Sequence, residues 1–158
     1  MLQRLLVSFL ALGLAACSGL PPNAVAPKVS VADVKPQSLG LYEQRFDVGL
    51  RVSNPNDFDL TIVALEFDLE VNGRPFAQGL SQASTRIPAT SSAVMWVDAI
   101  MQSKNLIQLF KTLPPEALTD GVPYRIKGRV KTDRSSSWVP LDHAGVYGRD
   151  AKPRGHAA

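Results

Sequence analysis

Apolar and polar residues alternate with a period of two along the middle of the chain. The segments RFDVGLRVS (45–53), LEFDLEV (65–71) and YRIKGRVK (124–131) each set an apolar face against a charged one. The apolar positions are Phe46, Val48, Leu50, Val52, Leu65, Phe67, Leu69, Val71, Tyr124, Ile126 and Val130. A strand with one buried apolar face and one solvent-exposed polar face is typical of antiparallel sheets packed face to face. The pattern predicts an all-β sandwich, with weaker strands at Lys28–Lys35, Ser92–Ile100 and Trp138–Leu141.

One segment, SKNLIQLFKTLPP (103–115), has helical spacing instead. Its apolar stripe consists of Leu106, Ile107, Phe110 and Leu113. We expect Ser103 to be the N-cap, Lys111 to complement the helix dipole in the last turn, and Pro114 to end the helix. The stripe is expected to cover an open end of the sandwich, and docking of a partner is the alternative.

The triplet Asn54-Pro55-Asn56 interrupts two alternating runs. Proline presets a turn and favours extended geometry in the residue before it, while asparagine side chains can bond backbone groups that an ended strand leaves unpaired. Further along, Asn72-Gly73 predicts a type I′ hairpin, and Pro75 places the returning strand at a sheet edge. These residues are interpreted as structural.

The corner also raises the possibility of a calcium site. Its oxygen-bearing side chains are Asn54, Asn56, Asp57 and Asp59. Their spacing does not follow the EF-hand pattern, because Phe58 stands where a ligand is needed and no distal glutamate follows in register. We therefore expect the corner to build the fold and expect no metal site.

The N-terminus has the pattern of an export signal. Arg4 precedes an apolar segment (5–14) and two alanines before Cys17. The apolar segment is shorter than the roughly 20 residues needed to cross a bilayer. Leu14 to Cys17 resembles a bacterial lipobox, which implies removal of residues 1–16 and lipidation of Cys17, the only cysteine. An ordinary cleaved signal with Cys17 near the cut is the alternative.

The remaining chain is expected to hold one domain. Residues 17–27 are proline-rich and predict an extended tether, at roughly 3.1 Å per residue. Residues 28–148 are expected to fold as the domain, and residues 149–158 as a disordered tail. Because Ser18 is not the aspartate that resembles an inner-membrane retention signal, we expect an outer-membrane anchor facing the periplasm.

The net charge of the mature chain is too small to predict binding to nucleic acid. Without Arg4, 16 Lys and Arg (17 − 1) stand against 14 Asp and Glu, a net of +2. One basic row could grip an anionic envelope polymer: Arg125, Lys127, Arg129 and Lys131, with Arg134 beyond. Tyr124 points to the other face, so base stacking is not supported. The favoured interpretation is a solvated face balanced by Glu66, Asp68 and Glu70.

No arrangement typical of an enzyme is evident in the sequence. The histidines are His143 and His156, and adjacency of Asp142 to His143 does not make a catalytic hydrogen bond. Glycine-rich phosphate loops, G-x-S-x-G and H-E-x-x-H motifs do not occur. We expect no catalytic residue, no cofactor and no small-molecule substrate.

The run DVGLRVSNPNDFDLTIVALEFDLEVNGRPFAQG (47–79) resembles the late embryogenesis abundant type 2 family, also called the water stress and hypersensitive response domain. The likeness spans roughly Pro27 to Asp133 and rests on Asn54-Pro55-Asn56, Asn72-Gly73 and Gly79. It implies an immunoglobulin or fibronectin type III-like antiparallel β-sandwich of about seven strands with one short α-helix. In such a fold, strands 65–71 and 124–131 should be neighbours.

The resemblance also implies a link to tolerance of drying and carries no established catalytic residue. Two functions are therefore considered. The first is a membrane-anchored protein that protects envelope macromolecules under water stress through weak contacts with protein clients. The second is an envelope adaptor that binds one specific protein or an anionic polymer, through an edge strand or the helix.

Overall fold

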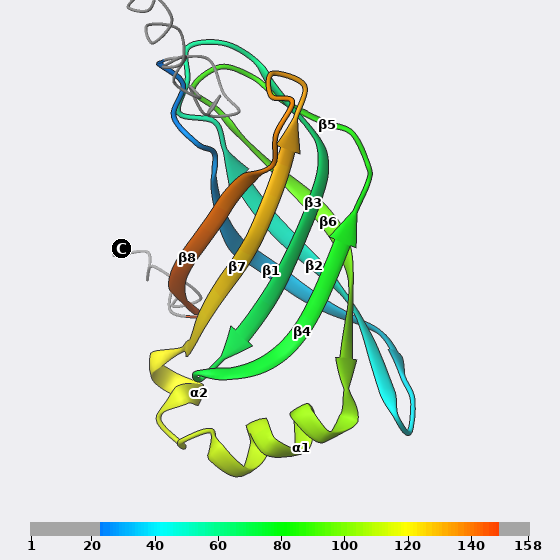
Figure 1. Ribbon diagram of the computed structural model, residues 1–158. Helices are drawn as coiled ribbons and strands as arrows, with labels where there is room; N and C mark the ends of the chain where they lie inside the picture. Colours follow the sequence, from blue (N-terminus) through cyan, green and yellow to red (C-terminus); the bar gives the residue numbers. More distant parts are fainter. Residues whose placement is uncertain (1–22, 149–158) are drawn as a thin grey trace, which may run out of the picture.

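The computed structural model describes residues 23–148, which form one strongly curled antiparallel sheet with two helices (Figure 1). The strands are β1 (Lys28–Leu39), β2 (Glu43–Ser53), β3 (Leu60–Val71), β4 (Arg74–Ser81), β5 (Thr85–Ile87), β6 (Ser92–Gln102), β7 (Val122–Thr132) and β8 (Val139–Tyr147). The helices are α1 (Ser103–Thr112) and α2 (Ala117–Asp120). The prediction of an all-β, antiparallel chain with a helix is confirmed.

The strand order is β1-β2-β6-β4-β3-β7-β8, and β5 pairs with β3. The link between β6 and β4 is short, because only Gln78↔Ile100 and Gly79↔Ala99 are paired. On either side of this link lie the two larger parts of the sheet, β1-β2-β6 and β4-β3-β7-β8. Hydrogen bonding is continuous across the link, and the fibronectin type III arrangement stays a prediction.

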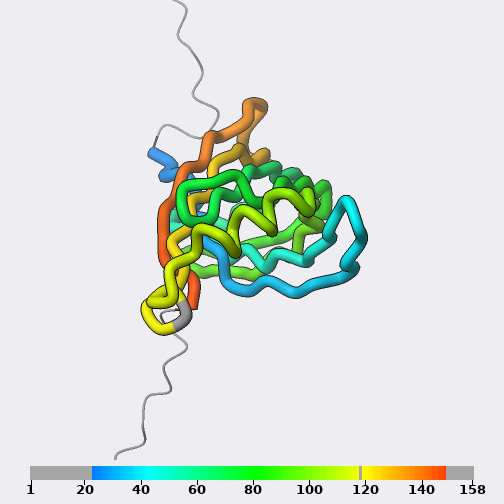
Figure 2. Tube along the Cα trace, turned by 90° about the horizontal axis from the view of Figure 1, so that it is seen from below, coloured from blue at the N-terminus to red at the C-terminus, as the bar shows by residue number. Residues whose placement is uncertain are grey.

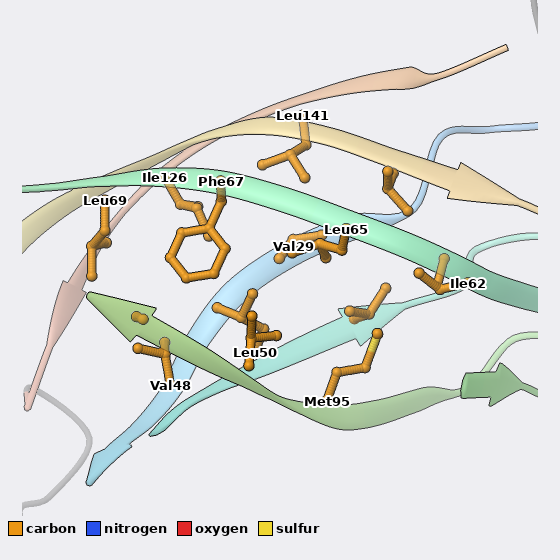
Figure 3. Close-up of a cluster of buried hydrophobic side chains, with 14 of the residues drawn as sticks. Val29, Val48, Leu50, Ile62, Leu65, Phe67, Leu69, Met95, Ile126 and Leu141 are labelled. Atoms are coloured by element: carbon orange, nitrogen blue, oxygen red, sulfur yellow. The ribbon is translucent and has the colours of Figure 1, made fainter. Parts of the chain in front are cut away.

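The core lies inside the curl of the sheet (Figure 3). The alternating faces predicted from the sequence are confirmed, since Val48, Leu50, Leu65, Phe67 and Ile126 are all buried there. Every buried member of this cluster falls between Val29 and Leu141. The strands within residues 23–148 enclose this cluster, so we expect this part of the chain to fold by itself.

The predicted pairing of the acidic and basic strands is confirmed. β3 and β7 are antiparallel neighbours, with Glu66 opposite Arg129, Asp68 opposite Lys127 and Glu70 opposite Arg125. Among these facing pairs Glu66 and Arg129 form an ion pair, while Lys127 pairs diagonally with Glu70, so the charges help to specify the register of the two strands. A slip by one residue would remove these pairs and turn the apolar side chains outward, so charge and hydrophobicity favour the same register.

The hairpin between β3 and β4 also follows its prediction. Asn72 and Gly73 both have positive φ (50° and 72°), as a type I′ turn requires. The Asn72 side chain donates a hydrogen bond to the Thr112 carbonyl at 3.0 Å, which ties the turn to the end of α1. The prediction that this strand lies at a sheet edge is wrong, because β4 lies between β6 and β3 in the strand order. Pro75 is tolerated because it lies in the half of β4 that does not pair with β6.

Two predictions about the helix need correction. The N-cap is Gln102, without a side-chain capping bond, and Ser103 is already helical. The Ser103 hydroxyl instead accepts a hydrogen bond from the Gln44 side chain at 2.8 Å. The apolar stripe covers the core only in part: Leu106 packs against it, whereas Ile107 and Phe110 are 54% and 72% exposed. Within residues 23–148, no helix is long and apolar enough to cross a bilayer.

Candidate functional site

The Asn54-Pro55-Asn56 corner is a saturated hydrogen-bond junction. The buried Asn54 amide donates to the Phe58 carbonyl (2.7 Å) and lies 3.3 Å from the carbonyls of both Ile87 and Pro88. Its side-chain oxygen accepts from the backbone and side-chain nitrogens of Asn56, at 3.1 and 2.9 Å. Asn54 therefore joins the loop after β2 to the loop between β5 and β6.

Asn56 extends this junction to the segment before β1. Its side-chain oxygen accepts from the Val25 N–H at 2.7 Å, and its side-chain nitrogen donates to the Val25 carbonyl at 2.9 Å. These paired bonds resemble those between neighbouring strands. Pro27 is buried as well. The folded body thus begins at or before Val25, within the segment that the sequence predicts to be tether.

Three of the four side chains that suggested calcium, Asn54, Asn56 and Asp59, accept hydrogen bonds from protein donors, and the fourth, Asp57, is exposed. Asp59 pairs with Arg86 and also accepts the Ala89 N–H at 3.0 Å. The hydrogen bond from Arg86 is the largest cause that lowers the pKa of Asp59 below its usual value, followed by the Ala89 bond. No group of three or more His, Cys, Asp or Glu side chains within residues 23–148 is arranged to hold a metal.

Three of the four cations in the basic row have carboxylate partners. Arg125 binds Asp142 through two hydrogen bonds of 2.7 and 2.6 Å, Lys127 lies 3.3 Å from Glu70, and Arg129 pairs with Glu66. The Arg125 hydrogen bonds are the largest cause that lowers the pKa of Asp142. Arg129 also lies over the Trp138 ring, 4.7 Å from its centroid. The row is largely balanced by its neighbours.

The Asp142–His143 pair considered for catalysis is divided between two environments. The Asp142 carboxylate binds Arg125, while the His143 ring lies beside the Tyr124 ring, with centroids 6.1 Å apart. Tyr124 itself faces the core, where its hydroxyl accepts the Val31 N–H at 3.1 Å. These contacts hold β7, β8 and β1 together. His156 and the predicted lipidation site, Cys17, lie outside the described residues.

An open groove of about 1320 Å³ was not predicted from the sequence. It runs along β3, β4 and β6, with Lys104 and Asn105 of α1 among its lining residues. Apolar side chains such as Phe76 and Ile100 share it with charged ones such as Asp68 and Lys127. Its lining residues come from strands that are distant in the sequence, so no local sequence signal indicates it.

A second unpredicted feature is a set of exposed apolar side chains on α1 and around the turn between β1 and β2, elements that lie at the bottom of Figure 1, at the end opposite the corner. We call it the distal apolar end, and it consists of Leu39, Leu41, Tyr42, Ile107 and Phe110, all exposed. Figure 2, seen from below, shows α1 crossing this end beside the turn between β1 and β2. The available sequence signal was the run Leu39-Gly40-Leu41-Tyr42, since turns are usually polar.

The chain matches one family profile and is similar to several solved structures. The sequence profile of the family described as late embryogenesis abundant protein (LEA_2) matches residues 49–145. The solution structure of AT1g01470 from Arabidopsis thaliana superposes with a TM-score of 0.51 at 15% identity, covering 85% of this chain and 88% of that one. A crystal structure of a protein from Archaeoglobus fulgidus gives a TM-score of 0.43 at 15% identity, covering 73% and 94%. No curated protein sequence matches the chain.

Proposed function

This chain belongs to the late embryogenesis abundant type 2 (LEA_2) family, and we propose that it protects macromolecules of the cell envelope during water stress, without catalysis. The observation that carries the proposal is the family match, which spans most of the sheet from β2 to β8. The contacts of the polar side chains are compatible with a non-catalytic function. The amides of Asn54 and Asn56 and most cations of the basic row bind other groups of the same fold. Protection would then act through broad, weak contacts with partly unfolded clients.

The finer architecture belongs to the same proposal. We take the sheet to be a variant of the fibronectin type III sandwich, whose two layers are β1-β2-β6 and β4-β3-β7-β8. The two-residue contact between β4 and β6 supports this division, because it is the shortest of the pairings along the strand order. The core lies between these two parts, as in a sandwich.

We further propose that the protein is lipid-anchored through Cys17 at the outer membrane, facing the periplasm. The mature protein is expected to begin at Cys17 and to carry the mass of three acyl chains, because more than one chain is needed for stable anchoring. Intact mass spectrometry of protein extracted from membranes checks this. Cys17→Ala should leave the chain uncleaved or release it from the membrane. A mature protein with an unmodified Cys17 would contradict the anchor.

The protective function is tested by drying. The chain from Asn23 to Ala158, which retains the Val25 contacts, is expected to preserve the activity of a labile enzyme through drying or freezing at a near-equimolar ratio. Protection should need no nucleotide, metal or disulfide, and it should rise gradually with concentration, because weak contacts with many clients do not saturate at one stoichiometry. Residual enzyme activity after rehydration is the measurement.

An equal mass of serum albumin is the matched control, since any inert protein protects to some extent by crowding. Protection no better than that of albumin would refute the proposal. The adaptor alternative is favoured by one observation, the half of β4 around Pro75 that lacks a strand partner on the side of β6, where an extended peptide could pair. One envelope protein recovered stoichiometrically with the chain would favour that alternative.

A further inference from the structure

We propose that the distal apolar end binds the surface of an anionic lipid bilayer. This inference goes beyond the protective function and does not depend on it. The strongest observation is exposure: Leu41 and Tyr42 are 88% and 87% exposed, and Phe110 is 72% exposed. Large apolar side chains stabilise a protein or an interface when they are buried, and these exposed ones contribute little to the fold.

The backbone that displays these side chains is held rigidly. Gln44 is buried and donates hydrogen bonds to the Gly40 carbonyl (2.5 Å) and to the Ser103 hydroxyl (2.8 Å). The Ser103 N–H in turn donates to the Tyr42 carbonyl at 3.0 Å. The turn between β1 and β2 is therefore fixed to the start of α1. Rigid display lowers the entropic cost of binding, because the exposed residues need no ordering of the backbone.

The charge on α1 complements an anionic surface. By helical spacing, Lys104 and Lys111 lie on the solvent side of Ile107 and Phe110, while Leu106 packs on the core side. Within residues 23–148 neither lysine forms an ion pair, and α1 contains no acidic residue. Glu43, the acidic residue nearest the turn in sequence, pairs with Arg45 at 3.2 Å. Apolar side chains bordered by lysines are typical of helices that lie in the headgroup region.

The shape of this end favours a lipid surface over a peptide. Peptides that bind through an apolar face usually enter a groove, whereas the distal apolar end projects from a turn and from the outside of a helix. The groove along β3, β4 and β6 is lined by none of the five residues of the distal apolar end. A projecting apolar end can instead penetrate the boundary between headgroups and acyl chains, where tyrosine side chains are also common.

The test is co-sedimentation of the chain from Asn23 to Ala158 with lipid vesicles. Vesicles of equal parts phosphatidylglycerol and phosphatidylcholine should bind it, and added salt should weaken the binding because the lysines are solvent-exposed. Phe110→Ser is expected to weaken the affinity about tenfold, and Leu41→Ser combined with Phe110→Ser about a hundredfold. Both positions are exposed, so the melting temperature should change little.

Leu80→Ser is the matched control, because Leu80 is 54% exposed on β4 and lies outside the distal apolar end. It should bind like the wild type, while Lys104→Glu with Lys111→Glu should reduce binding to the level of vesicles of phosphatidylcholine alone. Absence of binding by the wild type would overturn the proposal, as would an equal loss in Leu80→Ser and Phe110→Ser. If vesicles stay unbound but Phe110→Ser impairs suppression of protein aggregation, the surface contacts unfolded protein and the lipid proposal is wrong.

Discussion

Replacing Gly128 with alanine is expected to prevent the domain from folding stably. A Cβ atom at this position would lie 2.0 Å from the Glu66 carbonyl oxygen and 2.8 Å from the Cα atom of Phe67. Both belong to the backbone of β3, so the clash cannot be relieved by turning a side chain. β7 would have to move away from β3 and break the pairing along the middle of the sheet, at a cost of about 3 kcal/mol or more.

The measurement is the melting temperature by circular dichroism, together with the yield of soluble protein. Gly73→Ala is the matched control, because a Cβ there meets nothing within 4 Å, although the φ of 72° is unfavourable for alanine. It should cost only about 1 kcal/mol. If Gly128→Ala melts within a few degrees of the wild type, the close approach of β3 and β7 is wrong.

Asn54→Ala is expected to lower the melting temperature by about 10 °C, equivalent to about 3 kcal/mol at this chain length. The substitution removes the donor to the partly buried Phe58 carbonyl and the acceptor for the buried Asn56 N–H, and it leaves both backbone groups without that partner. The cost of an unsatisfied buried group exceeds the value of the bond itself. Thermal unfolding followed by circular dichroism measures the change.

Asn105→Ala serves as the control, since Asn105 is partly exposed in α1, where alanine is a good helix former. Its free energy of unfolding should stay within about 0.5 kcal/mol of the wild type. A calcium-dependent rise in the melting temperature of the wild type that is lost in Asn54→Ala would show that the corner is a metal site. A drop independent of calcium supports a purely structural corner.

Local pattern was sufficient to predict most of the strands and one of their most important pairings, although it missed β5. The alternation in β3 and β7 determines which side chains face the core, and the opposite charges on their outer faces agree with the observed register. The Asn72-Gly73 turn followed from the conformations that these residue types tolerate. In each case the structure is determined by residues that are close in the sequence, or by complementary side chains on two neighbouring strands.

The features that escaped prediction depend on contacts between distant segments. The sequence indicates that Asn54 and Asn56 need partners, but not that these partners are Ile87 and Val25, more than thirty residues away. The incomplete covering of the core by α1 depends on how Gln44 and Asn72 hold its two ends. A helical stripe predicts which side chains share a face, and only the packed structure decides how much of that face is covered.

The bonds between Asn56 and Val25 have a mechanical consequence. In a chain held at its N-terminal end, tension that reaches Val25 passes through its N–H and carbonyl to the side chain of Asn56. Without the hydrogen bonds between Asn56 and Val25, the load would act on Lys28↔Ser53, the first residue pair between β1 and β2. Strand pairs loaded at one end separate one residue pair at a time. The asparagine corner therefore opposes the separation of β1 from β2 under tension. It passes part of the load to the loops that Asn54 joins.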